Sequence, residues 1–153
     1  MISISNQDII DSVFSADGPL SGVKADYVPR ESQIAAAHEI LKTLDDKKHL
    51  VIEGPCGFGK TFAYLAPIFA KIHQEKMTSR QDLLPENFND DQPTPREVSR
   101  AVIVTSGITL QEQLVSTDLP NIDKAFVSLF NRSLSFAIMK GKANYLCRRK
   151  TDE

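Results

Sequence analysis

A glycine-rich turn that ends in a lysine and a threonine is the part of this sequence best suited to chemistry. It follows the pattern G-x-x-x-x-G-K-[ST], and its residues are Gly54, Pro55, Cys56, Gly57, Phe58, Gly59, Lys60 and Thr61. Glycines allow the backbone N–H groups of such a turn to point inward around the phosphates of a nucleotide. The lysine then supplies charge for the β- and γ-phosphates, and the threonine hydroxyl is suited to Mg²⁺. The turn therefore predicts a site for a nucleoside triphosphate and Mg²⁺, with Lys60 and Thr61 as its catalytic residues.

The segments on either side of the turn predict a strand before it and a helix after it. The apolar run His49–Glu53 is typical of a buried strand, and Lys60–Ile72 is typical of a helix that is apolar on most sides and distorted at Pro67. The motif binds phosphate in this context, so a chance glycine turn with an exposed lysine is the weaker interpretation. Cys56 is interpreted as a small filler residue, and the alternative is an oxidisable thiol sensitised by the helix N-terminus.

Further elements complete the pattern of an α/β domain. Apolar runs predict a second strand over Ala101–Thr105 and a third over Ser135–Met139. The spacing of apolar residues predicts helices over Ser5–Phe14, Arg30–Leu44, Thr109–Val115 and Asp118–Leu129. A strand, a glycine turn, a helix and a second strand form a βαβ unit, which predicts a parallel sheet covered by helices.

The chain divides into a short N-terminal part and one larger domain. Residues 1–28 are expected to hold the first helix and an extended linker over 20–28, and residues 29–153 to form the nucleotide-binding domain. Within this domain, the polar and proline-rich stretch 76–99 predicts a surface loop, and the stretch 140–153 is basic at its start.

The bulk composition excludes several classes of protein. The 153 residues are enough for one hydrophobic core, and 41% hydrophobic with 25% charged residues is ordinary for a soluble domain. A net charge of -2 gives no overall attraction to nucleic acid, so such binding would need a local basic patch. The sequence holds two cysteines and shows neither a secretory leader nor the roughly 20 apolar residues of a membrane-spanning helix. We therefore expect a reduced, cytoplasmic protein with no membrane partner.

Several segments outside the phosphate-binding turn follow one another in a recognisable order. They are Val13–Leu20, Tyr27–Gln33, Phe62–Pro67, Thr105–Leu114 and Lys140–Cys147. In this order they resemble the DinG/XPD-like branch of superfamily 2 DNA helicases, and most closely the bacterial DinG-like proteins. The resemblance covers essentially the whole chain apart from 76–99 and implies a RecA-like P-loop NTPase fold, of which this chain is an incomplete lobe. It also implies a motor that hydrolyses ATP to move 5′-to-3′ on single-stranded DNA.

The resemblance implies roles for two polar segments. Arg30 and Gln33 match the segment that contacts adenine, where a glutamine amide pairs with the base edge and an arginine plane stacks on the base. The alternative for both is a solvated position on the outer face of a helix. Thr105–Gln113 matches the segment that touches single-stranded DNA, and the alternative is an ordinary turn whose serine and threonine cap the next helix.

The C-terminal stretch carries a cysteine and a basic cluster, which begins the iron–sulfur region of the resembling proteins. Cys147 matches the first of four cysteines that hold a [4Fe–4S] cluster in this branch, so the resemblance implies a cluster ligand in a longer chain. Within this chain the other ligands are absent, and a lone thiol is expected. The basic cluster predicts either a contact with single-stranded DNA or a solvated tail. Its members are Lys140, Lys142, Arg148, Arg149 and Lys150, and Tyr145, which lies among them, could stack on a base.

Two parts of a complete helicase motor are missing from the sequence. It contains no apolar strand ending in an acidic pair that would hold Mg²⁺ and activate water, and no second lobe to supply an arginine. We therefore expect the chain alone to bind nucleotide weakly and to hydrolyse it hardly at all, whether it is a truncated product or a fragment. The alternative function is a truncated, non-catalytic module that holds nucleotide or DNA. A different P-loop ATPase, such as a transporter or kinase-type domain, is disfavoured by the segments around Gln33 and Gln111, and the oligomeric state is left open.

Overall fold

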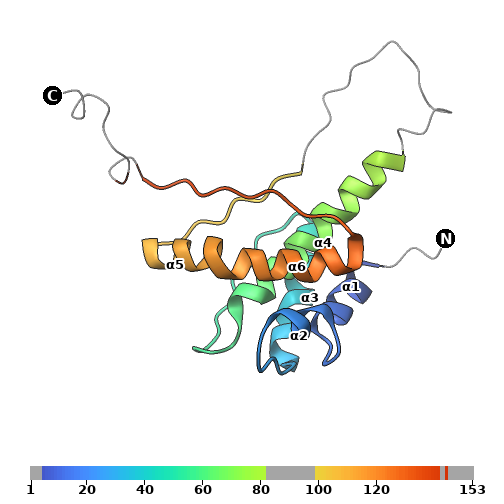
Figure 1. Cartoon of the computed structure of the whole chain (residues 1–153), viewed down its shortest axis with the longest axis horizontal. Coiled ribbons are helices and arrows are strands. Elements are labelled where there is room, and N and C mark those ends of the chain that lie inside the picture. Colours follow the sequence, from blue (N-terminus) through green and yellow to red (C-terminus); the bar gives the residue numbers. More distant parts are fainter. Residues whose placement is uncertain (1–4, 82–98, 142–143, 145–153) are drawn as a thin grey trace, which may run out of the picture.

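Helices supply the regular secondary structure of the part of the chain that the structure describes. The computed structural model describes residues 5–81, 99–141 and 144. The α-helices and one π-helical turn, η2, are α1 (Asn6–Phe14), α2 (Pro19–Val23), α3 (Glu31–Asp45), α4 (Lys60–Gln81), α5 (Ile108–Gln113), η2 (Leu114–Asp118) and α6 (Leu119–Phe130). α5, η2 and α6 lie end to end as one rod that crosses α4, while α1, α2 and α3 gather on one side of it (Figure 1).

The first helix begins at a capping box. The N–H of Asp8 donates to Oγ of Ser5 at 3.1 Å, and the N–H of Ser5 donates to the carboxylate of Asp8 at 3.1 Å. These reciprocal hydrogen bonds satisfy two N–H groups that a helix start would otherwise leave without partners. The hydroxyl of Ser5 and the backbone of Ser5 together lower the pKa of Asp8, because both donate to its charged form. The helix predicted over Ser5–Phe14 is therefore confirmed, with Ser5 as its cap.

The hydrophobic core lies where α4 meets the helices around it. α4 contacts α1, α3 and α6, and α2 packs against α6. Leu65 of α4 is fully buried, as the apolar pattern of this helix predicts. Other core side chains with no exposed surface come from four other helices and include Ile10, Phe14, Leu20, Ala37, Ile122 and Phe126. The core therefore fixes the position of α4, which carries the end of the phosphate-binding turn at its first residue.

α4 is longer than the sequence predicts. It spans 22 residues from Lys60 to Gln81 and continues through Pro67, which is itself buried within the bundle. Its last turns replace the start of the surface loop predicted over 76–99, and residues such as Gln, Glu, Lys, Met and Arg in this stretch favour a helix. The rest of that predicted loop, residues 82–98, lies outside the described residues. Among the helices that the structure describes, none combines the length and apolarity needed to cross a membrane.

The extended linker predicted over 20–28 is wrong for its first part. α2 occupies Pro19–Val23, with Pro19 at the helix start, where a missing N–H costs nothing. Leu20 follows it and is fully buried in the common core. A short apolar contact with α6 therefore makes this stretch part of the helical bundle.

The predicted parallel sheet is not confirmed. The segments 49–53, 101–105 and 135–139 carry no strand assignment, and no backbone hydrogen bond joins them within the described ranges. Apolar side chains that a sheet would cover are exposed instead, with 95% of Val51 and 88% of Val102 accessible. A strand is completed only by the hydrogen bonds of a neighbouring strand, and an apolar run does not supply that neighbour. The described part of the chain therefore shows the helical layer of an α/β fold beside three extended, unpaired segments.

Candidate nucleotide-binding site

The glycine-rich turn leads directly into the N-terminus of α4. The N–H of Phe58 donates to the carbonyl of Pro55 at 3.4 Å and so closes the turn. Gly57 and Gly59 have φ angles of 79° and 88°, a region that residues with a side chain rarely adopt. α4 then begins at Lys60. The conformation therefore uses its glycines as the phosphate-binding motif requires.

The first turn of α4 presents backbone N–H groups at the same place. The N–H of Ala63 donates to the carbonyl of Gly59 at 3.2 Å. The N–H groups before it in the helix have no carbonyl one turn earlier to accept from them, as at every helix start. Their combined partial positive charge favours a bound anion. The N-terminus of α4 is therefore suited to phosphate.

The ammonium group of Lys60 lies over the turn. Its Nζ donates to the carbonyl of Gly54 and, at 3.1 Å, to the carbonyl of Pro55. These acceptors are neutral, whereas a phosphate oxygen would form a stronger, charge-assisted hydrogen bond. Lys60 is therefore held at the mouth of the turn by contacts that a phosphate group can replace.

Arg30 and Gln33 both donate hydrogen bonds to carbonyl groups of the turn. The guanidinium of Arg30 donates to the carbonyl of Gly57, and the side-chain amide of Gln33 donates to the carbonyl of Gly59 at 2.8 Å. Only 3% of Gln33 is exposed, so the alternative of a solvated glutamine on the outer face of a helix is wrong. The structure thus brings both residues to the phosphate-binding turn, and their contact with adenine stays a prediction.

Thr61 is the second residue of α4 and is only partly exposed. Tyr64 lies one turn further along the same helix and is half-buried. Burial raises the pKa of Tyr64 most strongly, the hydrogen bond from Thr61 opposes this shift, and the charge of Asp118 adds to it. Burial also raises the pKa of Asp118, against a 3.1 Å hydrogen bond from the side chain of Gln113 and the charge of Lys24. The spacing of Thr61 and Tyr64 was visible in the sequence, whereas the burial of Asp118 depends on helix packing.

A cavity of about 340 Å³ opens beside Lys60. α3 lines it with Ile40 and Thr43, and the segment before the turn lines it with Leu50 and Ile52. Its size and its apolar walls with a few polar groups are typical of small-ligand sites. A bound nucleotide would therefore have a partly apolar space next to the phosphate-binding turn.

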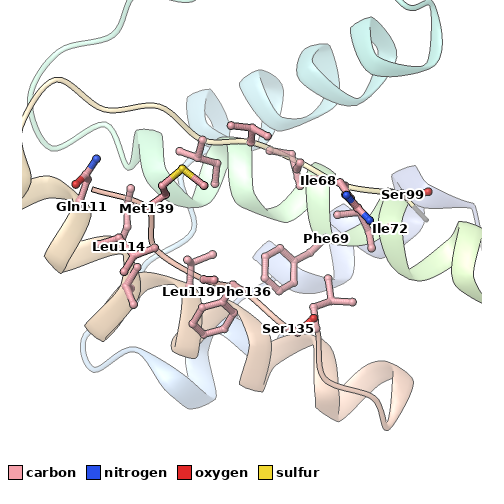
Figure 2. A pocket seen from close by; sticks show the side chains of 18 of the residues that line it. Ile68, Phe69, Ile72, Ser99, Gln111, Leu114, Leu119, Ser135, Phe136 and Met139 are labelled. Carbon is pink, nitrogen blue, oxygen red and sulfur yellow. The ribbon is translucent and has the colours of Figure 1, made fainter. Parts of the chain in front are cut away.

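The segment matched to single-stranded DNA borders a second, larger cavity. This cavity has a volume of about 570 Å³ and is lined by α4, by α5 and η2, and by the extended segments 99–105 and 134–139. Thr105 and Gln111 both line it. Figure 2 shows Gln111 next to Met139, at the end where α5 lies. The cavity thus lies between the two extended segments on one side and the helices α4 and α5 on the other.

The start of α5 shows whether a serine or threonine of the segment Thr105–Gln113 caps this helix. Gly107 is the N-cap of α5, and no side chain caps this helix, so the alternative in which a serine or threonine caps it is wrong. The hydroxyl of Thr105 instead donates to the carbonyl of Gly107 at 3.1 Å. Glu112 forms an ion pair of 3.0 Å with Lys140, which is the first residue of the basic cluster. Contact of this segment with DNA stays a prediction.

The two cysteines differ in what the structure describes. Cys56 is a free and exposed thiol within the phosphate-binding turn, and its interpretation as a small filler residue stays a prediction. Cys147 lies outside the described residues, as do the basic-cluster members Lys142, Tyr145, Arg148, Arg149 and Lys150. In the ranges that are described, no group of three or more histidine, cysteine, aspartate or glutamate side chains is arranged to hold a metal ion.

Comparisons with known proteins show the family to which the chain is similar. The family model described as "Type III restriction enzyme, res subunit" matches residues 26–133. The chain is 34% identical over 146 residues to the ATP-dependent DNA helicase YoaA of Haemophilus influenzae. The aligned region covers 94% of this chain and 18% of that protein. It is 30% identical over 126 residues to the ATP-dependent DNA helicase DinG of Escherichia coli, and the aligned region covers 81% of this chain and 14% of that protein.

A third relative gives the same result. The chain is 31% identical over 121 residues to the ATP-dependent helicase DinG of Mycobacterium tuberculosis, and the aligned region covers 79% of this chain and 15% of that protein. The chain spans less than a fifth of the length of these three relatives. No solved structure matches it.

Proposed function

Because this chain belongs to the family described as the type III restriction enzyme res subunit and is DinG-like, we propose that it is the ATP-binding part of an ATP-dependent DNA helicase. One observation carries the proposal. The turn Gly54–Thr61 enters α4 with Lys60 at its mouth, and Gln33 and Arg30 bond to its carbonyl groups. A family match alone does not say where these side chains lie, so their contacts with the turn are the support for the proposal.

Different groups at the turn contact different parts of ATP. The backbone N–H groups at the start of α4 bind the phosphates, and Lys60 exchanges the carbonyl oxygens of Gly54 and Pro55 for phosphate oxygens. The hydroxyl of Thr61 would hold Mg²⁺, and the ion would supply neutralisation of phosphate charge. Gln33 and Arg30 reach adenine from their positions against the turn, and their contacts favour ATP over GTP.

The second half of the proposal concerns DNA. Thr105–Gln113 holds the phosphates of single-stranded DNA with hydroxyl and backbone groups, and the cluster that begins at Lys140 adds positive charge. The ion pair between Lys140 and Glu112 supports the placement of these two features on one surface. Movement along DNA in the 5′-to-3′ direction and a cytoplasmic location belong to the same proposal, by resemblance.

An iron–sulfur cluster requires more than this chain supplies. A [4Fe–4S] cluster takes four thiolates or replacement ligands, whereas the sequence holds two cysteines, one of them within the phosphate-binding turn. The residues present therefore do not fit a complete cluster. In a longer chain we assign Cys147 as one ligand, and no step of the nucleotide chemistry passes through it.

Thermal unfolding tests the proposed nucleotide site. With Mg²⁺ present, rising ATP raises the melting temperature of the chain, since a ligand at ten times its Kd stabilises the folded state by about 1.4 kcal/mol. Lys60→Ala removes this rise, and the control Lys124→Ala keeps it, because Lys124 lies exposed on α6. GTP gives a smaller rise than ATP at the same concentration. An equal rise in the chain and in Lys60→Ala would contradict the proposed site.

Hydrolysis provides a separate test. The chain contains no acidic pair at a strand end to activate water, so we expect ATP binding without measurable release of phosphate, with or without an oligothymidylate. Steady turnover by this chain that Lys60→Ala abolishes would show that the catalytic carboxylate lies within these residues. It would then contradict the proposal that this part only binds ATP.

A further inference from the structure

The short helix that carries most of the proposed DNA segment is not held by the hydrophobic core. α5 spans Ile108–Gln113, and none of its residues is buried. Its side chains Ile108 and Leu110 are 46% and 41% exposed. α5 packs against η2, and within the described residues it has no comparable contact with another helix. Figure 1 shows it at the end of the rod that continues into α6, away from α1, α2 and α3. The direction of α5 therefore depends on its joint with η2.

This joint is a π-helical turn, and the sequence explains why it forms. Pro120 is the second residue of α6 and has no N–H to donate. In an uninterrupted α-helix its ring would also clash with the carbonyl of Ser116, one turn earlier. The N–H of Leu119 instead donates to the carbonyl of Leu114, which is the longer hydrogen-bond spacing of a π-helix. The joint is therefore built into the sequence, and such turns are frequent at functional sites.

One side-chain hydrogen bond spans the π-helical turn. The amide Nε2 of Gln113, the last residue of α5, donates to Oδ2 of Asp118 at 3.1 Å. Side chains three or four residues apart are neighbours on an α-helix, whereas these two are 5 residues apart. The wider π-helical turn is what brings them side by side. A regular α-helix at this place would therefore lose the bond.

The two ends of this hydrogen bond differ in burial. Gln113 is exposed, whereas only 6% of Asp118 is accessible at the end of η2. Leu114 at the start of η2 and Leu119 directly after it are both buried in the core, so the position of Asp118 is fixed. Its carboxylate accepts a charge-assisted hydrogen bond, which is stronger than one between neutral groups. Asp118 is therefore the anchor, and Gln113 is the point at which α5 is attached to it.

An ion pair also ties α5 to the start of the basic cluster. Glu112 lies 3.0 Å from Lys140, and 61% of the Glu112 side chain is exposed. Exposed ion pairs contribute little to stability and are screened by salt. Under the proposed function, phosphates of DNA would also compete with Glu112 for Lys140. The hydrogen bond to Asp118 does not face this competition, because its acceptor is buried.

We propose that Asp118 is a positioning residue for DNA binding. The hydrogen bond that it accepts from Gln113 holds α5, and with it the segment Thr105–Gln113, in the orientation that binds the phosphates of single-stranded DNA. This inference rests on the DNA half of the proposed function. Asp118 is buried and has the same sign of charge as DNA, so it acts through Gln113 and not by contact. A segment that is held in place beforehand loses less conformational entropy when it binds.

Fluorescence anisotropy of a labelled oligothymidylate measures the effect on DNA binding. Asp118→Ala removes the acceptor, so the affinity of the chain for the oligothymidylate falls several-fold while its affinity for ATP is unchanged. Asp118→Asn keeps an oxygen that accepts from Gln113, so it retains most of the affinity. Electrostatics alone predicts the opposite, because loss of a negative charge near DNA would strengthen binding in both variants. Thr117→Ala is the matched control, because Thr117 is exposed in the same turn and its hydroxyl contacts that of Ser116.

Hydrogen exchange measures the anchoring without DNA. In Asp118→Ala and in Gln113→Ala, the backbone N–H groups of α5 exchange several-fold faster, and those of α4 exchange as in the unmodified chain. The two substitutions together accelerate exchange no further than either one alone, because both break the same bond. Gln113→Ala changes an exposed residue, so its result decides the question if Asp118→Ala melts at a much lower temperature.

Each other outcome overturns a stated part of the account. If Asp118→Ala binds the oligothymidylate as tightly as the unmodified chain, or if α5 exchanges at an unchanged rate in both variants, the positioning role is wrong and the proposed function stands. An equal loss of affinity for ATP and for the oligothymidylate would mean that Asp118 only stabilises the fold, which also overturns the inference. If the unmodified chain binds ATP but no oligothymidylate, the DNA half of the proposed function and the inference fail together, and the ATP site stands.

Discussion

The side-chain amide of Gln33 donates a 2.8 Å hydrogen bond to the carbonyl of Gly59, so α3 holds the last glycine of the phosphate-binding turn. Gly59 has a φ of 88°, and a methyl group built on it would lie 2.2 Å from the amide nitrogen of Gln33. The conformation therefore requires glycine at this position, and a larger residue would also displace the end of the Gln33 side chain. The link also means that a residue matched to adenine helps to shape the site for the phosphates.

Alanine substitutions at three glycines separate these two requirements. Gly59→Ala loses roughly 1–2 kcal/mol for its left-handed conformation and about 0.5–1.5 kcal/mol more because the end of the Gln33 side chain must move and its hydrogen bond is lost. Gly57→Ala has the same kind of φ but no atom within 4 Å of the added methyl, so only the conformational loss is expected. Gly22→Ala, in α2 and with open space around it, gains about 0.5–1 kcal/mol. Urea unfolding measures all three, and equal losses for Gly59→Ala and Gly57→Ala would contradict the contact.

Gln33→Glu tests the donor in the same hydrogen bond. The substitution keeps the shape of the side chain but replaces the amide donor with a carboxylate, which faces the carbonyl of Gly59 as a second acceptor. We expect a loss of about 1–3 kcal/mol in the free energy of unfolding, because both groups are left without a partner in a buried place. Glu39→Gln, the reverse change at an exposed position of α3, is the control. A Gln33→Glu variant as stable as the chain itself would remove the link between α3 and the turn.

His73 is a buried histidine in α4 without hydrogen-bond partners among the described residues. Only 1% of it is exposed, and neither of its ring nitrogens is satisfied. Its ring stacks on Phe126 and Phe130, with centroid distances of 5.5 and 4.8 Å. A neutral ring suits this aromatic environment, and a charged one would be costly there.

This environment predicts how stability depends on pH. Burial lowers the pKa of His73, and the charges of Lys76 and Arg132 act in the same direction against the charge of Asp123. The unfolded chain therefore binds this proton more readily, so the stability that His73 contributes is complete above its unfolded pKa of about 6.5 and is lost as the pH falls below it. Unfolding of His73→Phe, which keeps the ring without a proton site, should show a weaker loss between about pH 7 and pH 5. Parallel curves for the two proteins would contradict this assignment.

Leu65→Ala tests the core beneath the phosphate-binding turn. Leu65 has no exposed surface, so its truncation should leave a cavity and cost about 2–5 kcal/mol. Leu129→Ala is the matched control, because 40% of Leu129 is exposed at the end of α6, and a much smaller loss is expected. Thermal or denaturant unfolding measures both variants. Similar losses would mean that α4 is not packed as described.

The features that sequence could predict are those set by local pattern. The helix that follows Ser5, the burial of Leu65 and the turn before Lys60 depend on residue type and spacing within a few positions. The resemblance to DinG-like helicases is confirmed by the family model and the relatives. Short-range signals were therefore enough to locate the candidate site.

The features that sequence missed depend on partners distant in the chain. α2 exists because Leu20 is buried in the core, which its polar neighbours do not indicate. The burial of Asp118 and its hydrogen bond from Gln113 follow from the π-helical turn and the packing of α6. The segments predicted as strands are apolar, but Val51 and Val102 are exposed. An apolar composition does not by itself provide the neighbouring strand that completes the hydrogen bonds of a sheet. Sequence pattern thus predicted the helices around the turn, whereas the sheet is not confirmed in the described residues.

Calorimetric titration of ATP with Mg²⁺ into this chain and into Lys60→Ala tests the central claim most directly. The account predicts weak, saturable binding with one site to the chain, and no binding to a Lys60→Ala variant that melts at the same temperature. Binding that survives in Lys60→Ala would contradict the placement of the phosphates at the turn. Absence of binding to the chain itself would contradict its assignment as an ATP-binding part.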